Sequence, residues 1–179
     1  MKRQDLEHVL RASSEITGER DIVVLGSQAI LGTADERGLP ADLTRSIEVD
    51  LAFPSDADGS IADMVDGAIG ELSRFHETFG YYPHGVGLET AVLPPGWRKR
   101  VAILDTPATG QARGLCLEPH DLAASKLAAW REKDRDYVRV LLESGLVSKR
   151  TLLSRVRSLH GPSPASRAMM VDWISAQSV

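Results

Sequence analysis

Residues 46–53 alternate strictly between polar and apolar side chains, and this pattern constrains the fold more than any other segment. Three alternate positions are apolar: Ile47, Val49 and Leu51. Glu48 and Asp50 occupy positions between them. Because successive side chains of a strand point to opposite faces, the segment predicts a half-buried strand. Both carboxylates then lie together on its exposed face.

An apolar, β-branched run at 21–25 predicts a buried strand about twenty residues before the acidic pair. It ends at Gly26 and Ser27, and we expect Ser27 to be the N-cap of a helix that begins at Gln28. Glycine allows the backbone to approach a phosphate closely, and a helix N-terminus with a serine offers hydrogen-bond donors. The turn therefore has the chemistry of an anion-binding loop.

Apolar periodicity and breaker residues define the remaining elements. Helices are expected at 6–16, 61–72, 119–142, 148–159 and 164–174, and further strands at 86–93 and 100–104. We predict an α+β fold, a small mixed sheet flanked by helices with a C-terminal helical bundle. Residues 1–115 would form the core, and residues 116–179 a helical region packed on it. Neither a G-x-G-x-x-G turn nor a P-loop is present.

The composition excludes several classes of protein. The 179 residues carry a formal charge of −4, which is atypical of a general nucleic-acid binder, although basic residues cluster at 97–100, 126–135 and 149–157. The single cysteine, Cys116, excludes an internal disulfide framework and is expected to be buried as a small apolar residue. No apolar run approaches the roughly 20 residues that span a bilayer. We expect a cytoplasmic protein with no membrane partner.

Carboxylates at positions i and i+2 of a strand can hold the same cation or an adjacent pair of cations. Mg²⁺ prefers oxygen ligands, commonly one or two carboxylates together with substrate phosphates. Glu48 and Asp50 are therefore the predicted metal ligands, and a nucleoside triphosphate (NTP) would need such charge neutralisation.

The Gly-Ser turn followed by the acidic strand resembles the DNA-polymerase-β-like nucleotidyltransferase superfamily. More narrowly, the chain is similar to minimal bacterial nucleotidyltransferases of the AbiEii and MenT toxin kind. Four stretches carry the resemblance, which spans roughly 22–145: Gly26-Ser27-Gln28-Ala29, Arg45-Ser46-x-Glu48-x-Asp50, residues 118–127 and residues 131–134. The chain departs from the family pattern at Glu48, where the first aspartate is usual.

The resemblance implies a Mg²⁺-dependent transfer of a nucleoside monophosphate from an NTP to an acceptor hydroxyl. The implied acceptor is RNA, most plausibly the tRNA 3′ end, and the implied protein partner is a cognate antitoxin. The implied catalytic residues are Glu48, Asp50 and Glu89, with Asp105 as the alternative third carboxylate. The implied nucleotide-binding residues are Gly26, Ser27, Arg45, Lys126, Lys133 and Asp134.

Several of these assignments depend on predicted elements. Lys126, Lys133 and Asp134 would share one face of the helix at 119–142, whereas Arg131 would lie off that face. Glu89 would lie on the strand at 86–93. His76 and His84 lack further ligands at zinc-site spacing and are expected to be structural or solvent-facing loop residues.

Two alternatives remain open from the sequence. One is a catalytically weak or silent nucleotidyltransferase-fold module that binds a nucleotide or a partner protein. The other is an enzyme that modifies a small molecule instead of RNA. A purely structural protein would leave the acidic pair unexplained.

Overall fold

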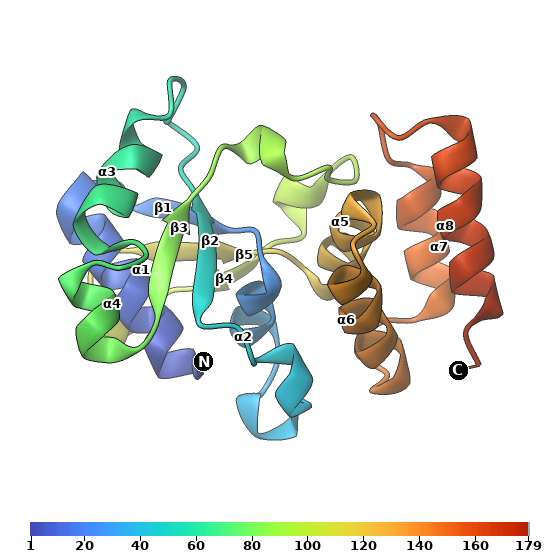
Figure 1. The fold of residues 1–179 in the computed structure, drawn as a ribbon, viewed down its shortest axis with the longest axis horizontal. Helices are drawn as coiled ribbons and strands as arrows, with labels where there is room; N and C mark the ends of the chain where they lie inside the picture. Colours follow the sequence, from blue (N-terminus) through green and yellow to red (C-terminus); the bar gives the residue numbers. More distant parts are fainter. Residues whose placement is uncertain (179) are drawn as a thin grey trace. The chain divides into compact units, whose positions relative to one another are not determined.

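The computed structural model describes residues 1–178, which divide into two compact units. The first unit comprises Met1–Thr90 and Val101–Leu117. The second comprises Ala91–Arg100 and the chain from Glu118 onward. The predicted α+β class is confirmed, with a five-stranded mixed sheet in the first unit and helices in both (Figure 1). Among the described residues, no helix has the length and apolarity needed to cross a membrane.

The sheet of the first unit has the strand order β3-β2-β1-β5-β4. Its strands are β1 (Asp21–Val24), β2 (Glu48–Ala52), β3 (Tyr82–Gly85), β4 (Ala102–Leu104) and β5 (Arg113–Cys116). The pairs β1–β2 and β4–β5 are antiparallel, whereas β1–β5 and β2–β3 are parallel. The acidic strand β2 therefore lies between the buried strand β1 and the edge strand β3.

Four α-helices accompany this sheet: α1 (Arg3–Thr17), α2 (Ile30–Thr33), α3 (Ser60–Ile69) and α4 (Arg74–Phe79). Helix α3 packs against β3 and α1, and α2 packs against β4 and β5. The apolar face of α1 and the central strands form the core, where Leu6, Leu10, Ile22, Val24, Val49 and Leu51 are fully buried. Burial of these side chains removes apolar surface from water and fixes β2 in its register.

The second unit is helical and contains α5 (Pro119–Ala129), α6 (Glu132–Glu143), α7 (Lys149–Arg157) and α8 (Pro164–Ala176). Helix α5 packs against α6 and α7, and α7 packs against α8. Ser148 and Ser163 cap α7 and α8, because each side-chain oxygen accepts a hydrogen bond from a backbone N–H of the first turn. The helices expected at 148–159 and 164–174 are thus confirmed.

The single helix predicted at 119–142 is wrong. Trp130 has a left-handed φ of 58° and separates α5 from α6. Arg135 stabilises this break, because its guanidinium donates a hydrogen bond to the Trp130 carbonyl and lies 5.2 Å from the centre of the Trp130 ring.

The strand predicted at 86–93 is also wrong. The ladder partner of β2 is Tyr82–Gly85, and the chain then forms a 3₁₀ turn at Leu88–Thr90. The aromatic pair Tyr81-Tyr82 at the start of β3 has the higher strand propensity, whereas Gly87 weakens the predicted segment. Strand β5 was not predicted at all, because its four residues are too short to show a period.

Two smaller predictions also fail, one at the acidic strand and one at the Gly26–Ser27 turn. Ile47 is 47% exposed instead of buried, because β2 begins only at Glu48. Gly26 is the N-cap of the 3₁₀ turn Ser27–Ala29, so Ser27 is its first residue and not its cap.

The fold predicts the chemical inertness of Cys116. The thiol is completely buried, and burial raises its pKa to about 12. Because the thiolate is the reactive species, the native protein should not react with a disulfide reagent such as DTNB at pH 8. Unfolding in guanidinium chloride should release one reactive thiol per chain. Rapid labelling of the native protein would contradict the burial.

Candidate metal centre

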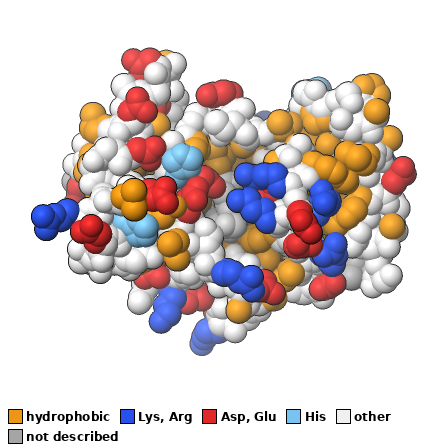
Figure 2. Space-filling view, in the orientation of Figure 1, with side chains coloured by type: hydrophobic (Ala, Val, Ile, Leu, Met, Phe, Trp, Pro, Cys, Tyr) orange, Lys and Arg blue, Asp and Glu red, His pale blue; other side chains and the backbone are white. Residues whose placement is uncertain are grey.

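Two carboxylates and an imidazole meet at the edge of the sheet in the first unit. In the β2–β3 register, Asp50 is opposite His84. The His84 Nδ1 atom lies 3.2 Å from Glu48 Oε1 and 3.4 Å from Asp50 Oδ1. One potential ligand atom from each of the three residues lies within 4.8 Å of the others. Figure 2 shows acidic and histidine side chains together over β2 and β3.

The Gly26–Ser27 turn lies directly against this cluster. The backbone N–H of Leu25 donates to the Asp50 carbonyl at 3.0 Å, which joins the end of β1 to the acidic strand. A Cβ atom added to Gly26 would lie 2.0 Å from Asp50 Oδ2, closer than any real contact allows. Gly26 has a φ of −83°, which any residue can adopt, so this close approach is what requires glycine.

The carboxylates around His84 set the electrostatics of this position. Burial lowers the pKa of His84, but the carboxylates of Asp66, Asp50 and Glu48 outweigh it, and the net effect raises the pKa above its usual value. Asp66 reaches the same region because its Oδ1 accepts a hydrogen bond from the backbone N–H of Gly85 at 2.7 Å. The surrounding field is therefore one that attracts a cation.

Tyr82 borders the centre on the side of Glu48. Its hydroxyl donates to Glu48 Oε2 at 3.4 Å. Burial and the Glu48 charge raise the pKa of the Tyr82 phenol, which keeps it a neutral donor.

The donor set fits a divalent cation. The Glu48, Asp50 and His84 side chains are 40%, 35% and 48% exposed, so they leave room for further ligands from solvent or substrate. Catalytic metal sites keep such open positions, whereas structural zinc sites are closed by four protein ligands.

His84 is the residue that sequence reasoning assigned differently. It lies on β3 and not in a loop, and it faces the acidic pair. The available signal was the β-propensity of Tyr81-Tyr82, which would have placed a strand, and His84 with it, beside β2.

The other predicted residues of the first unit are not members of the Glu48, Asp50 and His84 cluster. Arg45 is exposed and pairs with Asp42. Glu89 is in the 3₁₀ turn Leu88–Thr90, where its carboxylate folds back over Gly87. Asp105 follows β4, which is three strands from β2 in the sheet order, or roughly 14 Å at the usual strand spacing.

The predicted residues of the second unit surround a buried aspartate. Asp134 is 1% exposed at its side chain and accepts hydrogen bonds from Lys126 Nζ at 3.2 Å and Arg131 Nε at 2.6 Å. Lys126 Nζ also lies 4.6 Å from the centre of the Tyr137 ring. Lys133 is exposed. The single helix face predicted for Lys126, Lys133 and Asp134 is wrong, because α5 ends at the Trp130 break before α6 begins. Lys126 and Asp134 nevertheless meet across this break, and Arg131 joins them at Asp134.

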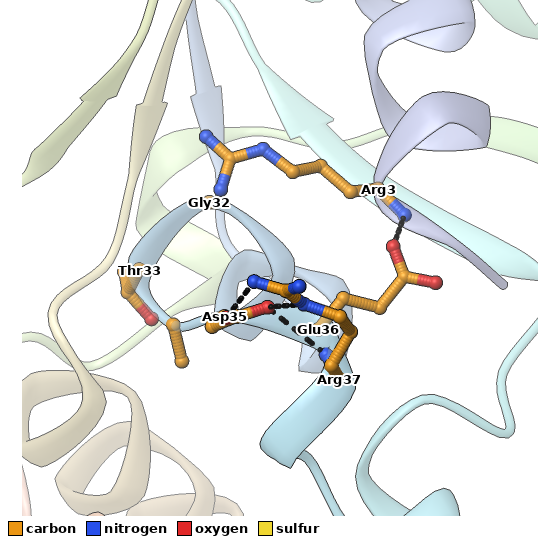
Figure 3. A pocket seen from close by; sticks show the side chains of 7 residues that line it. Arg3, Gly32, Thr33, Asp35, Glu36 and Arg37 are labelled. Atoms are coloured by element: carbon orange, nitrogen blue, oxygen red, sulfur yellow. Dashed lines mark hydrogen bonds and ion pairs between the residues drawn. The ribbon is translucent and has the colours of Figure 1, made fainter.

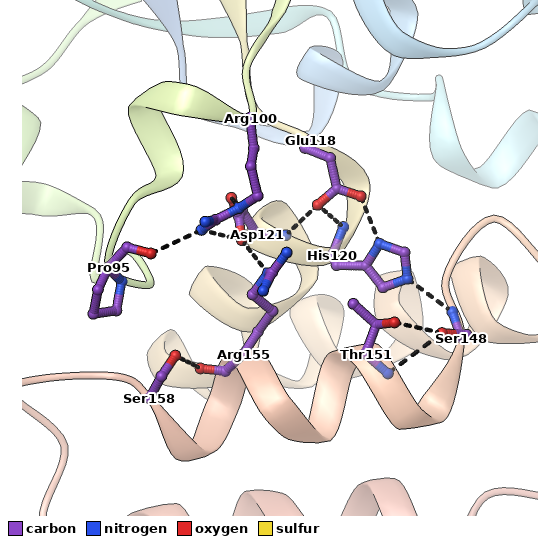
Figure 4. A network of polar contacts seen from close by, with 9 residues as sticks. All are labelled: Pro95, Arg100, Glu118, His120, Asp121, Ser148, Thr151, Arg155 and Ser158. Atoms are coloured by element: carbon purple, nitrogen blue, oxygen red, sulfur yellow. Dashed lines mark hydrogen bonds and ion pairs between the residues drawn. The ribbon is translucent and has the colours of Figure 1, made fainter.

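A second buried aspartate anchors the helices of this unit (Figure 4). Asp121 receives two hydrogen bonds from Arg100, at 2.8 and 3.0 Å, and an ion pair from Arg155 at 2.9 Å. Arg100 is thus a structural residue of the predicted basic segment at 97–100. Beside it, His120 Nε2 accepts a hydrogen bond from the backbone N–H of Ser148, which links α5 to the start of α7.

A hollow of about 600 Å³ lies elsewhere on the first unit (Figure 3). Its lining includes Arg3 and the segment from Gly32 to Arg37. Asp35 pairs with Arg37, and Glu36 accepts a hydrogen bond from the backbone N–H of Arg3. None of its charged groups belongs to the acidic pair, so we do not place the reaction there.

Comparison with known proteins gives one informative match. A family described as "Nucleotidyltransferase of unknown function (DUF6036)" matches residues 4–168. The match covers both units and every residue of the metal centre. No curated protein and no solved structure matches the chain.

The buried ion-pair cluster predicts how stability depends on Asp134. Burial raises the pKa of this carboxyl, but Arg131 and Lys126 lower it more, so its folded pKa is below the unfolded value. Asp134→Asn should therefore lower the free energy of unfolding by about 2–3 kcal/mol at pH 7, measured by urea denaturation. The difference in unfolding free energy between the wild type and Asp134→Asn should shrink as pH falls below about 4, because Asp134 loses its stabilising charge as pH falls through its folded pKa.

Asp136 provides the matched control on the same helix. Its ion pair with Arg139 is exposed, so Asp136→Asn should cost less than about 0.5 kcal/mol. Equal losses from the two variants would contradict a structural role specific to Asp134.

Proposed function

The chain belongs to this family of nucleotidyltransferases, and we propose from that premise a specific reaction. The protein transfers a nucleoside monophosphate from an NTP to an acceptor hydroxyl and releases pyrophosphate. The acceptor oxygen forms a bond to the α-phosphorus, the bond to the pyrophosphate oxygen breaks, and the acceptor proton passes to a base.

The observation that carries this proposal is the close approach of Gly26 to Asp50. The Gly26–Ser27 turn and a carboxylate pair are brought together with no room for a side chain between them. Phosphoryl transfer needs both parts in one place, since the triphosphate must be positioned while its charge is neutralised. This arrangement favours the enzyme over a silent binding module.

We assign the residues of the centre as follows. Glu48 and Asp50 would hold Mg²⁺, which when bound would neutralise phosphate charge and orient the triphosphate. Gly26 and Ser27 cradle the β- and γ-phosphates through backbone N–H groups and the Ser27 hydroxyl. Asp50 accepts the acceptor proton.

The resemblance to nucleotidyltransferases suggests further roles for residues outside the metal centre. Glu89 is the alternative proton acceptor. Arg45, Lys126 and Lys133 neutralise triphosphate charge, and Asp134 orients Lys126, a role supported by their 3.2 Å hydrogen bond.

The charge distribution supports an RNA acceptor. The second unit carries thirteen Lys and Arg against seven Asp and Glu, whereas the first carries eight against eighteen. Their formal charges of +6 and −10 give the total of −4. In Figure 2, Lys and Arg side chains gather over the helices of the second unit. A basic surface of this kind binds phosphate backbones. The net charge of the whole chain does not reveal this surface, because the acidic first unit outweighs the basic second unit.

Aromatic side chains accompany the basic ones in the second unit. The rings of Trp130 and Trp173 are 6.4 Å apart, and Arg139 lies 6.0 Å from the Trp173 ring. Such rings can stack on unpaired bases, as at a single-stranded RNA end. We therefore propose RNA as the acceptor, with the tRNA 3′ end and a toxin–antitoxin role suggested by the family resemblance.

Label transfer tests the function directly. Purified protein with Mg²⁺, total tRNA and each α-labelled NTP in turn should transfer label to RNA. Asp50→Asn should lower the rate by at least roughly 10³-fold, because it removes both a metal ligand and the proposed base. Transfer to a small molecule with inert RNA would identify the alternative acceptor class. Nucleotide binding by calorimetry without any transfer would identify a silent module.

Gly26→Ala tests the close approach. The added methyl displaces the Asp50 carboxylate, so the rate of transfer should fall by roughly 10²-fold, the penalty for misplacing a reacting group by about 1 Å. Gly38→Ala is the matched control, because nothing lies within 4 Å of a Cβ at Gly38. A fully active Gly26→Ala enzyme would remove the turn from the site.

A further inference from the structure

We propose that His84 is the third protein ligand of the metal centre and makes it prefer Mn²⁺ over Mg²⁺. The inference rests on the proposed function, because it concerns the same site. It assigns to an imidazole the position at which the sequence led us to expect a third carboxylate.

The distances are those of neighbouring ligands on one ion. Ligands about 2.1 Å from an octahedral ion and at right angles to each other lie roughly 3.0 Å apart. His84 Nδ1 is 3.2 Å from Glu48 Oε1 and 3.4 Å from Asp50 Oδ1, close to this spacing on both sides.

The backbone holds these groups in position. The His84 and Asp50 residues are register partners in the parallel β2–β3 ladder, and Glu48 is two residues away on the same face. Ligands on hydrogen-bonded strands are positioned more precisely than ligands on loops. Gly85, the residue after His84, adds a further restraint, because its backbone N–H donates a hydrogen bond to Asp66 Oδ1.

The two carboxylates considered as third ligands do not compete for this position. Among residues 1–178, the cluster of three potential ligand side chains consists of Glu48, Asp50 and His84 and includes neither Glu89 nor Asp105. Glu89 folds over Gly87, and Asp105 is three strands away in the sheet.

The donor types determine the metal preference. Mg²⁺ favours oxygen ligands and gains little from a nitrogen donor. Imidazole suits first-row transition metals, and carboxylates and water suit Mn²⁺. A centre with two carboxylates, one imidazole and open positions therefore matches a six-coordinate Mn²⁺ ion, while it still admits Mg²⁺.

Metal binding by the full-length protein without nucleotide tests the inference. Mn²⁺ is titrated and its free concentration followed by electron paramagnetic resonance, and Mg²⁺ affinity is obtained by competition. The wild type should bind Mn²⁺ at least roughly tenfold more tightly than Mg²⁺. His84→Asp supplies a third oxygen ligand and should reduce this preference roughly tenfold while retaining metal binding.

Two further variants separate ligation from folding. His84→Gln should weaken Mn²⁺ binding roughly tenfold, with unchanged circular dichroism, because His84 is half exposed. His160→Asn is the matched control; His160 is exposed and in the second unit, so its replacement should change neither affinity.

The outcomes distinguish the two proposals. Equal Mn²⁺/Mg²⁺ preference in the wild type and His84→Asp, or no Mn²⁺ binding by folded wild type at 1 mM, overturns the role of His84. If Mg²⁺ nevertheless supports label transfer to an acceptor, the proposed function stands without a metal-binding role for His84. If the Mn²⁺ preference depends on His84 but no label is transferred to any acceptor, the metal site stands and the proposed function is overturned.

Discussion

The packing of Gly26 against the Asp50 carboxylate is the constraint on which the site depends. It joins the end of β1 to the middle of β2, so that the Gly26–Ser27 turn lies against the Asp50 carboxylate. The antiparallel β1–β2 ladder and the buried Val49 and Leu51 side chains hold this approach in register. A slip of one residue would turn both carboxylates into the core, which the cost of burying unpaired charge forbids.

The two units differ in how they treat charge. In the first, Glu48, Asp50 and Asp66 gather around one histidine, which leaves a field suited to a cation. In the second, the buried aspartates Asp121 and Asp134 are each held by two basic side chains. Removing one partner of such a cluster leaves a buried charge unpaired, so these clusters fix the helices in place.

The sequence predicted short-range features better than long-range ones. Strict alternation identified β2, and the Gly-Ser turn identified the end of β1, because both signals are local. The interruption at Trp130 was missed because a left-handed tryptophan has no propensity signal and depends on Arg135 for stabilisation. Strand β3 was placed a few residues too late, since its position follows from pairing with β2 and not from its own period.

The sequence by itself determined the acidic strand, the glycine turn, the α+β class and membership of a nucleotidyltransferase family, because each follows from short patterns and their order along the chain. Only the tertiary structure decided which distant groups join them. It brought His84 to the acidic pair through the β2–β3 register, and it placed Glu89 in a 3₁₀ turn outside the cluster. Strand pairing is set by the competition of all segments for one sheet edge, and no single stretch of sequence contains that information.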